Sequence, residues 1–124
     1  MKLFTIEEAN DLIPILRPKL NRIKNLYEVI GSLRESAAAA AAASAAGGGM
    51  RGGQRYVKTL YEVGKLMTEL ADTGVELKDH DRGLIDFPSL RNGRVVLLCW
   101  QLDEGDEVLW WHDVEAGFAG RQPL

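Results

Sequence analysis

Residues 84–112 read LIDFPSLRNGRVVLLCWQLDEGDEVLWWH. Asn92-Gly93 is typical of a two-residue hairpin turn, and Glu104-Gly105 is a second turn signal in the same stretch. Between the two turns the chain is apolar at almost every position, which is typical of a central strand with both faces covered. We therefore predict three antiparallel strands, at Leu84–Leu90, Arg94–Leu102 and Glu107–His112, and a further short strand at Val75–Leu77.

The two turns also predict which side chains share a face of this sheet. With two-residue loops, Asp86 lies opposite Cys99, Cys99 lies opposite Trp110, and His112 is diagonal to Cys99. One face is then purely apolar and should cover the helices: Ile85, Phe87, Leu98, Trp100, Leu102, Leu109 and Trp111. The other face is mixed, with Asp86, Leu97, Cys99, Gln101, Trp110 and His112. Pro88 has no N–H, so we expect it at an edge-side or bulged position.

Three interpretations of the mixed face stay open. It can be a partly solvated surface with Trp110 covered by the C-terminal tail. It can be a protein interface, because an aromatic side chain among polar groups is typical of interaction hot spots. It can also be a site, where Asp86, Cys99 and His112 ligate a transition metal or Cys99 acts as a thiolate nucleophile beside His112. The sequence has no second cysteine and no HExxH motif, so we assign no catalytic residue and leave the question of a metal open.

Upstream of the sheet the apolar period becomes helical. Thr5 and Glu8 have the spacing of a capping box, which predicts a short helix from Ile6 to Leu12. Pro14 and Pro18 then predict a break or kink near Pro14, with the main helix starting there. Its apolar stripe is Ile13, Leu16, Leu20, Ile23, Tyr27 and Ile30, and that of a second helix at Gln54–Asp72 is Tyr56, Leu60, Val63, Met67 and Leu70.

An alanine-rich tract at 37–46 and a glycine-rich tract at 47–53 separate the two stripes. Alanine lets the first helix continue, and we expect the glycines to form a flexible tip rather than a phosphate loop, since no GK[ST] follows. The predicted fold is an α+β single domain (1–124) with a coiled-coil-like antiparallel helical hairpin on a three- to four-stranded antiparallel sheet. Its parts are a first helical segment (4–46), the tip (47–53), a second helix (54–73), the sheet (75–112) and a C-terminal tail (113–124).

The net charge of −3 argues against a dedicated nucleic-acid binder. Residues 1–60 carry a net +4 and residues 61–124 a net −7, so the two halves can attract each other within one chain or between two. The cations of the first helix (Arg17, Lys19, Arg22 and Lys24) are expected on a solvated face, with contact to phosphate or an acidic partner as the alternative.

Cys99 is the one cysteine, so the fold cannot depend on an internal disulfide. The N-terminus does not resemble a signal peptide and no uncharged apolar run is long enough to span a bilayer, which together predict a cytoplasmic protein. His80 lies in an acidic stretch with Glu76, Asp79 and Asp81, which we interpret as a solvated turn rather than a cation site. In the tail, Phe118 is expected to pack back onto the domain and Arg121 to pair with an acidic residue.

Four segments resemble one known family. They are FTIEEANDLIPILRP (4–18), GLIDFP (83–88), VLLCW (96–100) and WHDVEAGFAGRQPL (111–124), and they are similar to the uncharacterised bacterial domain-of-unknown-function 2203 family. The alanine-glycine tract is not part of the resemblance. The resemblance to this family implies no activity. It singles out as characteristic residues Asp86, Cys99, Trp100, Trp111, His112, Phe118 and Arg121.

From the sequence we expect a non-enzymatic module that self-associates, as a dimer, or binds another protein, without a cofactor and without a membrane. One alternative is a metal- or thiol-dependent enzyme that uses Asp86, Cys99 and His112. Another is nucleic-acid binding along the basic first helix, which would weaken steeply with salt.

Overall fold

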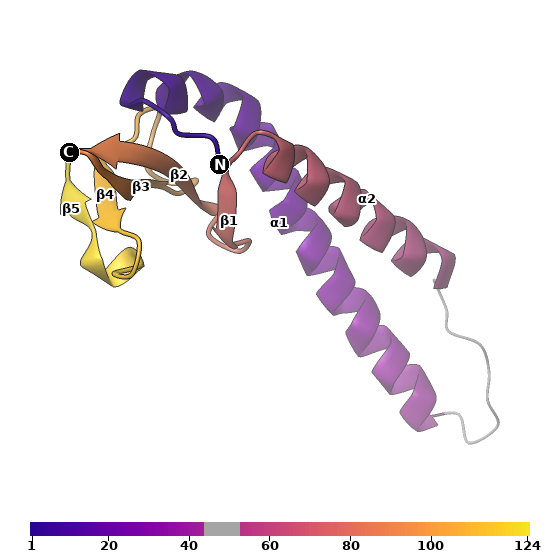
Figure 1. Cartoon of the computed structure of the whole chain (residues 1–124). Coiled ribbons are helices and arrows are strands. Elements are labelled where there is room, and N and C mark those ends of the chain that lie inside the picture. Colours follow the sequence, from indigo (N-terminus) through magenta and orange to yellow (C-terminus); the bar gives the residue numbers. More distant parts are fainter. Residues whose placement is uncertain (44–52) are drawn as a thin grey trace.

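The computed structural model describes residues 1–43 and 53–124, and it confirms the predicted fold class (Figure 1). Two antiparallel helices pack on one antiparallel sheet with the strand order β1-β2-β3-β4-β5. The sheet has five strands rather than three or four, because the last residues of the tail add a short one. The elements are α1 (Ile6–Ala43), α2 (Gly53–Asp72), β1 (Glu76–Asp79), β2 (Leu84–Arg91), β3 (Arg94–Trp100), β4 (Trp110–Asp113), the 3₁₀ turn η1 (Phe118–Gly120) and β5 (Gln122–Pro123).

Helix α1 begins with the predicted capping box. The Thr5 hydroxyl accepts the N–H of Glu8 at 3.0 Å, and the Glu8 carboxylate accepts the N–H of Thr5 at 3.0 Å. This hydrogen bonding lowers the pKa of Glu8. The two contacts satisfy two of the N–H groups that the first turn of a helix leaves without an intrahelical partner.

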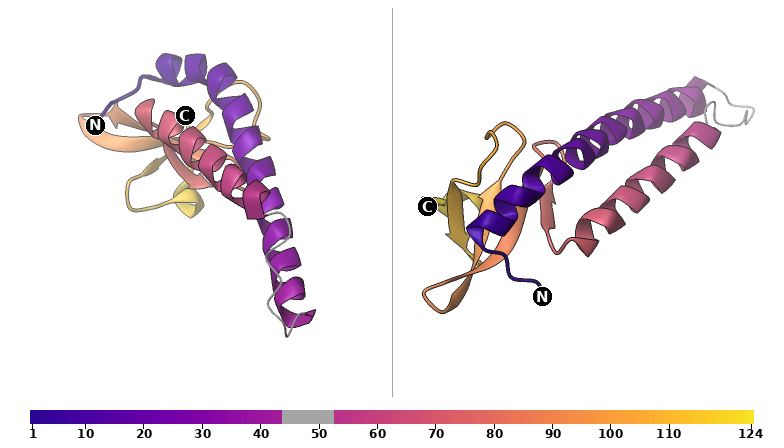
Figure 2. Two further views of the ribbon diagram at one scale, coloured as in Figure 1. Left: turned by 90° about the vertical axis from the view of Figure 1, so that its right-hand side faces the viewer. Right: turned by 90° about the horizontal axis from the view of Figure 1, so that it is seen from above.

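The predicted kink near Pro14 is present, but the prediction that the main helix starts there is wrong. Helix α1 is continuous from Ile6, with Pro14 and Pro18 inside it. Both prolines lie on the exposed face of α1, where water can reach the carbonyl groups that lose their N–H partners. The neighbouring Ile13 and Leu16 are fully buried and hold the helix on the sheet. Figures 1 and 2 show the result, a bend between the first turns of α1, drawn in indigo, and the rest of the helix.

Helices α1 and α2 form the predicted hairpin, which projects away from the sheet (Figures 1 and 2). Leu26, Ile30 and Val63 form its apolar core beyond the sheet. The predicted stripe of α2 is wrong at Leu60, which is exposed. Thr59 is buried in its place and donates its hydroxyl hydrogen to the carbonyl of Arg55. The predictions for residues 44–52, including most of the glycine-rich tip, lie outside the described residues.

The expected attraction between the two halves of the chain occurs within one chain. Arg17 pairs with Asp106 of the loop after β3, Lys19 with Glu69 of α2, and Arg22 with Glu62 of α2. The basic residues of α1 therefore contact acidic side chains that follow them in the sequence.

The predicted register of β2 and β3 is confirmed. Asn92 and Gly93 have φ angles of 52° and 74°, as a two-residue type I′ turn requires, and the turn places Asp86 opposite Cys99. Pro88 lies beyond the end of β1, on the open side of β2. Its carbonyl accepts the N–H of Phe4 at 2.7 Å and so faces away from β3. The nitrogen of the same residue faces the same side, so the missing N–H removes no hydrogen bond between β2 and β3.

The predicted two-residue loop at Glu104-Gly105 is wrong, although it gave correct pairs for β4. Residues 101–109 form a longer loop that α1 holds: Arg17 donates to the carbonyl of Gly105, and Asn10 accepts the N–H of Val108. Trp100 at the end of β3 also donates its Nε1–H to the carbonyl of Gly105. Leu109 is about half exposed instead of lying on the core face.

The core lies between α1, the end of α2 and one face of the sheet. Ile85, Phe87, Leu98, Trp100 and Trp111 are buried there, as predicted, and Leu102 is partly buried against them. Helices long and apolar enough to cross a membrane are absent from residues 1–43 and 53–124.

Candidate functional site

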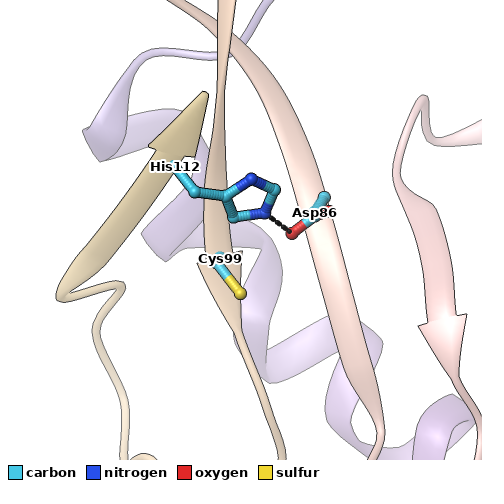
Figure 3. Close-up of side chains that lie close together, drawn as sticks. All are labelled: Asp86, Cys99 and His112. Atoms are coloured by element: carbon cyan, nitrogen blue, oxygen red, sulfur yellow. Dashed lines mark hydrogen bonds and ion pairs between the residues drawn. The ribbon is translucent and has the colours of Figure 1, made fainter. Parts of the chain in front are cut away.

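Three side chains converge on the sheet face opposite the helices. Asp86 comes from β2, Cys99 from β3 and His112 from β4, which are adjacent strands. One ligand-type atom of each, a carboxylate oxygen, the sulfur and a ring nitrogen, lies within 4.8 Å of the other two. Figure 3 shows the three side chains on one side of the sheet, with the hydrogen bond between His112 and Asp86. We call these three residues the Asp-Cys-His cluster.

The Asp-Cys-His cluster is buried. Asp86, Cys99 and His112 are each at most 2% exposed. The chain after β4 folds back over this side of the sheet, as the yellow segment in Figure 1 shows. A cavity of about 240 Å³ remains between this segment, β1 and the cluster, and Lys78, Leu84, Val114 and Phe118 form its walls. The mixed face is thus buried at Asp86, Leu97, Cys99 and His112, whereas Gln101 and Trp110 stay partly exposed.

One hydrogen bond determines which nitrogen of His112 carries its proton. His112 Nδ1 lies 2.8 Å from the carbonyl oxygen of Asp113. A carbonyl oxygen can only accept, so Nδ1 must donate. The other nitrogen, Nε2, lies 3.1 Å from the carboxylate of Asp86. A neutral imidazole therefore directs the lone pair of Nε2 at a carboxylate, and only a proton or a metal cation between the two atoms makes this contact favourable.

Burial keeps the Cys99 thiol protonated in the absence of a cation. Two effects raise the pKa of Cys99 to about 12: burial away from solvent, which is the larger, and the negative charge of the nearby Asp86. Such a thiol is a poor nucleophile on its own, because the thiolate is the reactive form. A metal ion reverses this situation by binding the thiolate and releasing the proton.

The other expected site residues lie beside the Asp-Cys-His cluster rather than in it. Trp110 pairs with Cys99 across the strands and stacks under the guanidinium of Arg121 at 5.0 Å. Phe118 lies at the cavity, with Arg82 at 4.1 Å and Arg121 at 4.7 Å from its ring centroid. Trp110 and Phe118 thus help to hold the tail against the cluster.

Arg121 does pair with an acidic residue. Its guanidinium contacts both carboxylate oxygens of Glu104, at 2.6 and 2.7 Å, and both side chains are largely buried. The pair joins the tail to the loop at 101–109.

The acidic stretch around His80 stabilises the fold. His80 stacks on Tyr27 with ring centroids 3.7 Å apart, and Asp79 accepts the N–H groups of the turn that follows it.

Sequence reasoning missed Lys78 and Glu104. Lys78 lies at an irregularity in the β1–β2 pairing, which shifts register between Leu77 and Asp79, and its side chain reaches the cavity. No sequence signal indicates this bulge. The sequence predicts Glu104 in a tight turn, and nothing local indicates that it pairs with Arg121 of the tail.

The fold and the cluster define a class: an α+β protein in which a folded-back tail encloses a carboxylate, a thiol and an imidazole on the outer face of a small sheet. The chain belongs to a family described as "Uncharacterized conserved protein (DUF2203)", whose family model matches residues 2–124. Comparison with curated proteins and with solved structures gave no match.

Proposed function

We propose that this protein binds one divalent transition-metal ion, zinc being the best fit, through Asp86, Cys99 and His112. The observation that carries the proposal is the orientation of His112. Its Nδ1 donates to a backbone carbonyl, and its Nε2 faces both a carboxylate and a thiol. In metal sites a ligating histidine almost always donates its second ring nitrogen in this way.

The charges of the donor set support the proposal. A divalent ion with one carboxylate and one thiolate gives a neutral centre, and a neutral centre avoids the large free-energy cost of burying net charge. Nitrogen, sulfur and oxygen donors together suit zinc, which accepts all three types.

The geometry requires little movement. A tetrahedral ion with bonds of about 2.0–2.3 Å holds its ligand atoms about 3.3–3.8 Å apart. The Asp86–His112 contact is already 3.1 Å, and the three ligand atoms lie within 4.8 Å of one another. Among the residues that the structure describes, this is the one group of three or more such side chains with this spacing. Three protein ligands leave a fourth position toward the cavity, which is typical of reactive rather than structural zinc sites.

Elemental analysis of protein purified without a His-tag tests the proposal. We expect about one equivalent of metal in the wild type and at least a tenfold loss of affinity in Asp86→Asn, Cys99→Ser and His112→Gln, as removal of a ligand should cause. The matched controls are Asp11→Asn and His80→Gln, which lie outside the cluster and should retain the metal. Wild-type protein that takes up no zinc after dialysis against zinc, while remaining folded, would show the proposal to be wrong.

A reducing compartment such as the cytoplasm is part of the proposal. A zinc thiolate is held as the reduced sulfur, and the chain has no second cysteine with which to form an internal disulfide.

The second function that we propose is self-association through α2. Val57 lies about one helical turn before Leu60 and Tyr61, and the three side chains are 65%, 41% and 74% exposed. Neighbouring exposed apolar side chains of this kind are typical of interaction surfaces.

Nucleic-acid binding along α1 has less support, because Arg17, Lys19 and Arg22 already form ion pairs within the chain.

Sedimentation velocity at micromolar concentration tests self-association. We expect a dimer for the wild type and a monomer for Tyr61→Glu. Asp11→Lys, a charge reversal at an exposed position near the start of α1, is the control that stays dimeric. A monomeric wild type would exclude this interface.

A further inference from the structure

We infer that the cavity above the Asp-Cys-His cluster binds a small organic carboxylate with a short apolar chain. The carboxylate takes the open position on the metal, near the ammonium group of Lys78. The apolar chain lies against Leu84, Val114 and Phe118. This inference rests on the proposed metal site and names the class of ligand that the site takes.

The cavity has a buried floor and an accessible rim. Asp86, Cys99 and His112 form the floor and are at most 2% exposed, whereas Lys78, Val114 and Phe118 at the rim are exposed. A ligand can therefore enter between β1 and the tail and reach the donor atoms without unfolding of the sheet.

The position of Lys78 is the second observation. Bulges often redirect a side chain next to a functional site, and the irregularity in β1 lies at Lys78. Its nearest acidic partner, Glu76, is at 3.8 Å, the long end of an ion pair, and the Lys78 side chain is 46% exposed. The ammonium group is thus available to an anion in the cavity. Arg82, stacked on Phe118, adds positive charge at the same rim.

The binding depends on the metal because the ion supplies a Lewis acid. Without a metal, the floor has no Lewis acid to bind an anionic oxygen. With a divalent ion held by one carboxylate and one thiolate the floor is neutral, and the metal attracts an anionic oxygen as a Lewis acid. The remaining negative charge of the ligand is then matched by Lys78.

The size and lining of the cavity limit the rest of the ligand. About 240 Å³ is smaller than the roughly 300–1,000 Å³ of pockets that take drug-sized molecules. The walls above the cluster are mostly aliphatic and aromatic, contributed by Leu84, Leu97, Val114 and Phe118. A chain of a few methylene groups suits them better than a sugar or a nucleotide, whose hydroxyl groups would lose their hydrogen bonds to water.

Calorimetric titration of zinc-loaded protein with hexanoate, and with the neutral isostere hexanamide, tests the inference. We expect hexanoate to bind at least tenfold more tightly than hexanamide, and to lose this advantage when a chelator has removed the zinc. Lys78→Gln should weaken hexanoate binding about three- to tenfold with little effect on hexanamide. Phe118→Ala should weaken both ligands, and Lys65→Gln, far from the cavity, should change neither.

The outcomes separate the inference from the proposed function. Protein that holds stoichiometric zinc but binds hexanoate no better than hexanamide overturns the ligand class and leaves the metal site standing. Equal hexanoate binding with and without zinc also overturns it. Protein that takes up no zinc overturns both.

Discussion

At the scale of single residues, the backbone of β4 sets the orientation of the His112 imidazole and the position of its proton. The Asp113 carbonyl fixes the proton on Nδ1, and the pairing of β4 with β3 brings Nε2 to Asp86 and Cys99. In the metal-free protein, burial keeps the Cys99 thiol protonated. Binding of one divalent ion to the cluster would therefore release the thiol proton.

The thiol of Cys99 should make the stability of metal-free protein dependent on pH. Its pKa is raised to about 12 in the folded state by burial and by the Asp86 charge, against 9.0 ordinarily. Between these values the unfolded chain loses a proton that the folded chain keeps, so the free energy of unfolding falls as the pH rises from about 9 toward 12. We expect this fall, between pH 8 and 10.5, to be about 1–2 kcal/mol larger in the wild type than in Cys99→Ala.

Urea unfolding in the presence of a chelator measures this difference. The comparison with Cys99→Ala removes the contribution of lysine and tyrosine side chains, which titrate in the same range. Equal slopes of stability against pH in the two proteins would mean that the thiol is not held in its protonated form.

At the scale of elements, the two-residue turn at Asn92-Gly93 explains why much of the cluster could be predicted. An Asn-Gly pair strongly favours one turn type, and the turn fixes every cross-strand pair of β2 and β3, including Asp86 opposite Cys99. The capping box at Thr5 and Glu8 was equally local and is confirmed. Predictions that depended on tertiary contacts were wrong in part: α1 bends near Pro14 but continues through it because the sheet holds it, and the loop at 101–109 is long because Arg17 and Asn10 hold it.

The N-cap of α1 gives a prediction at this scale. Thr5→Ala removes the hydroxyl that accepts the Glu8 N–H and should lower the free energy of unfolding by about 1 kcal/mol. Thr68→Ala is the control, because the exposed Thr68 hydroxyl bonds within the middle of α2, and it should change stability by less than about 0.5 kcal/mol. Thermal unfolding of both variants measures the difference, and equal effects would argue against the cap.

At the scale of the whole molecule, the tail converts an open sheet face into an enclosed site. Strand β5 pairs with β4, and Arg121 joins the tail to Glu104 in the loop after β3. The sequence predicted that the tail packs back and that Arg121 pairs with an acidic residue, but neither strand β5 nor Glu104 as the partner. A two-residue strand that contains Pro123 has no alternating pattern, and the partner of Arg121 lies 17 positions away in a loop that was misassigned.

The Arg121–Glu104 pair should therefore contribute more than the ion pairs of the helical hairpin. Its side chains are 11% and 15% exposed, against 55% and 40% for Arg22 and Glu62. Arg121→Ala leaves Glu104 buried without its partner and should cost about 2–4 kcal/mol, whereas Arg22→Ala should cost less than about 1 kcal/mol. Urea unfolding compares the two variants. A cost for Arg121→Ala as small as that of Arg22→Ala would show that the tail is not held by this pair.

X-ray absorption at the zinc edge, on zinc-loaded protein, tests the metal centre most directly, because it measures the donor atoms themselves. The cluster predicts one sulfur at about 2.3 Å and nitrogen or oxygen neighbours at about 2.0–2.2 Å. In Cys99→Ser the sulfur neighbour should disappear. A shell of nitrogen and oxygen alone in the wild type would contradict the assignment of Asp86, Cys99 and His112 as the ligands.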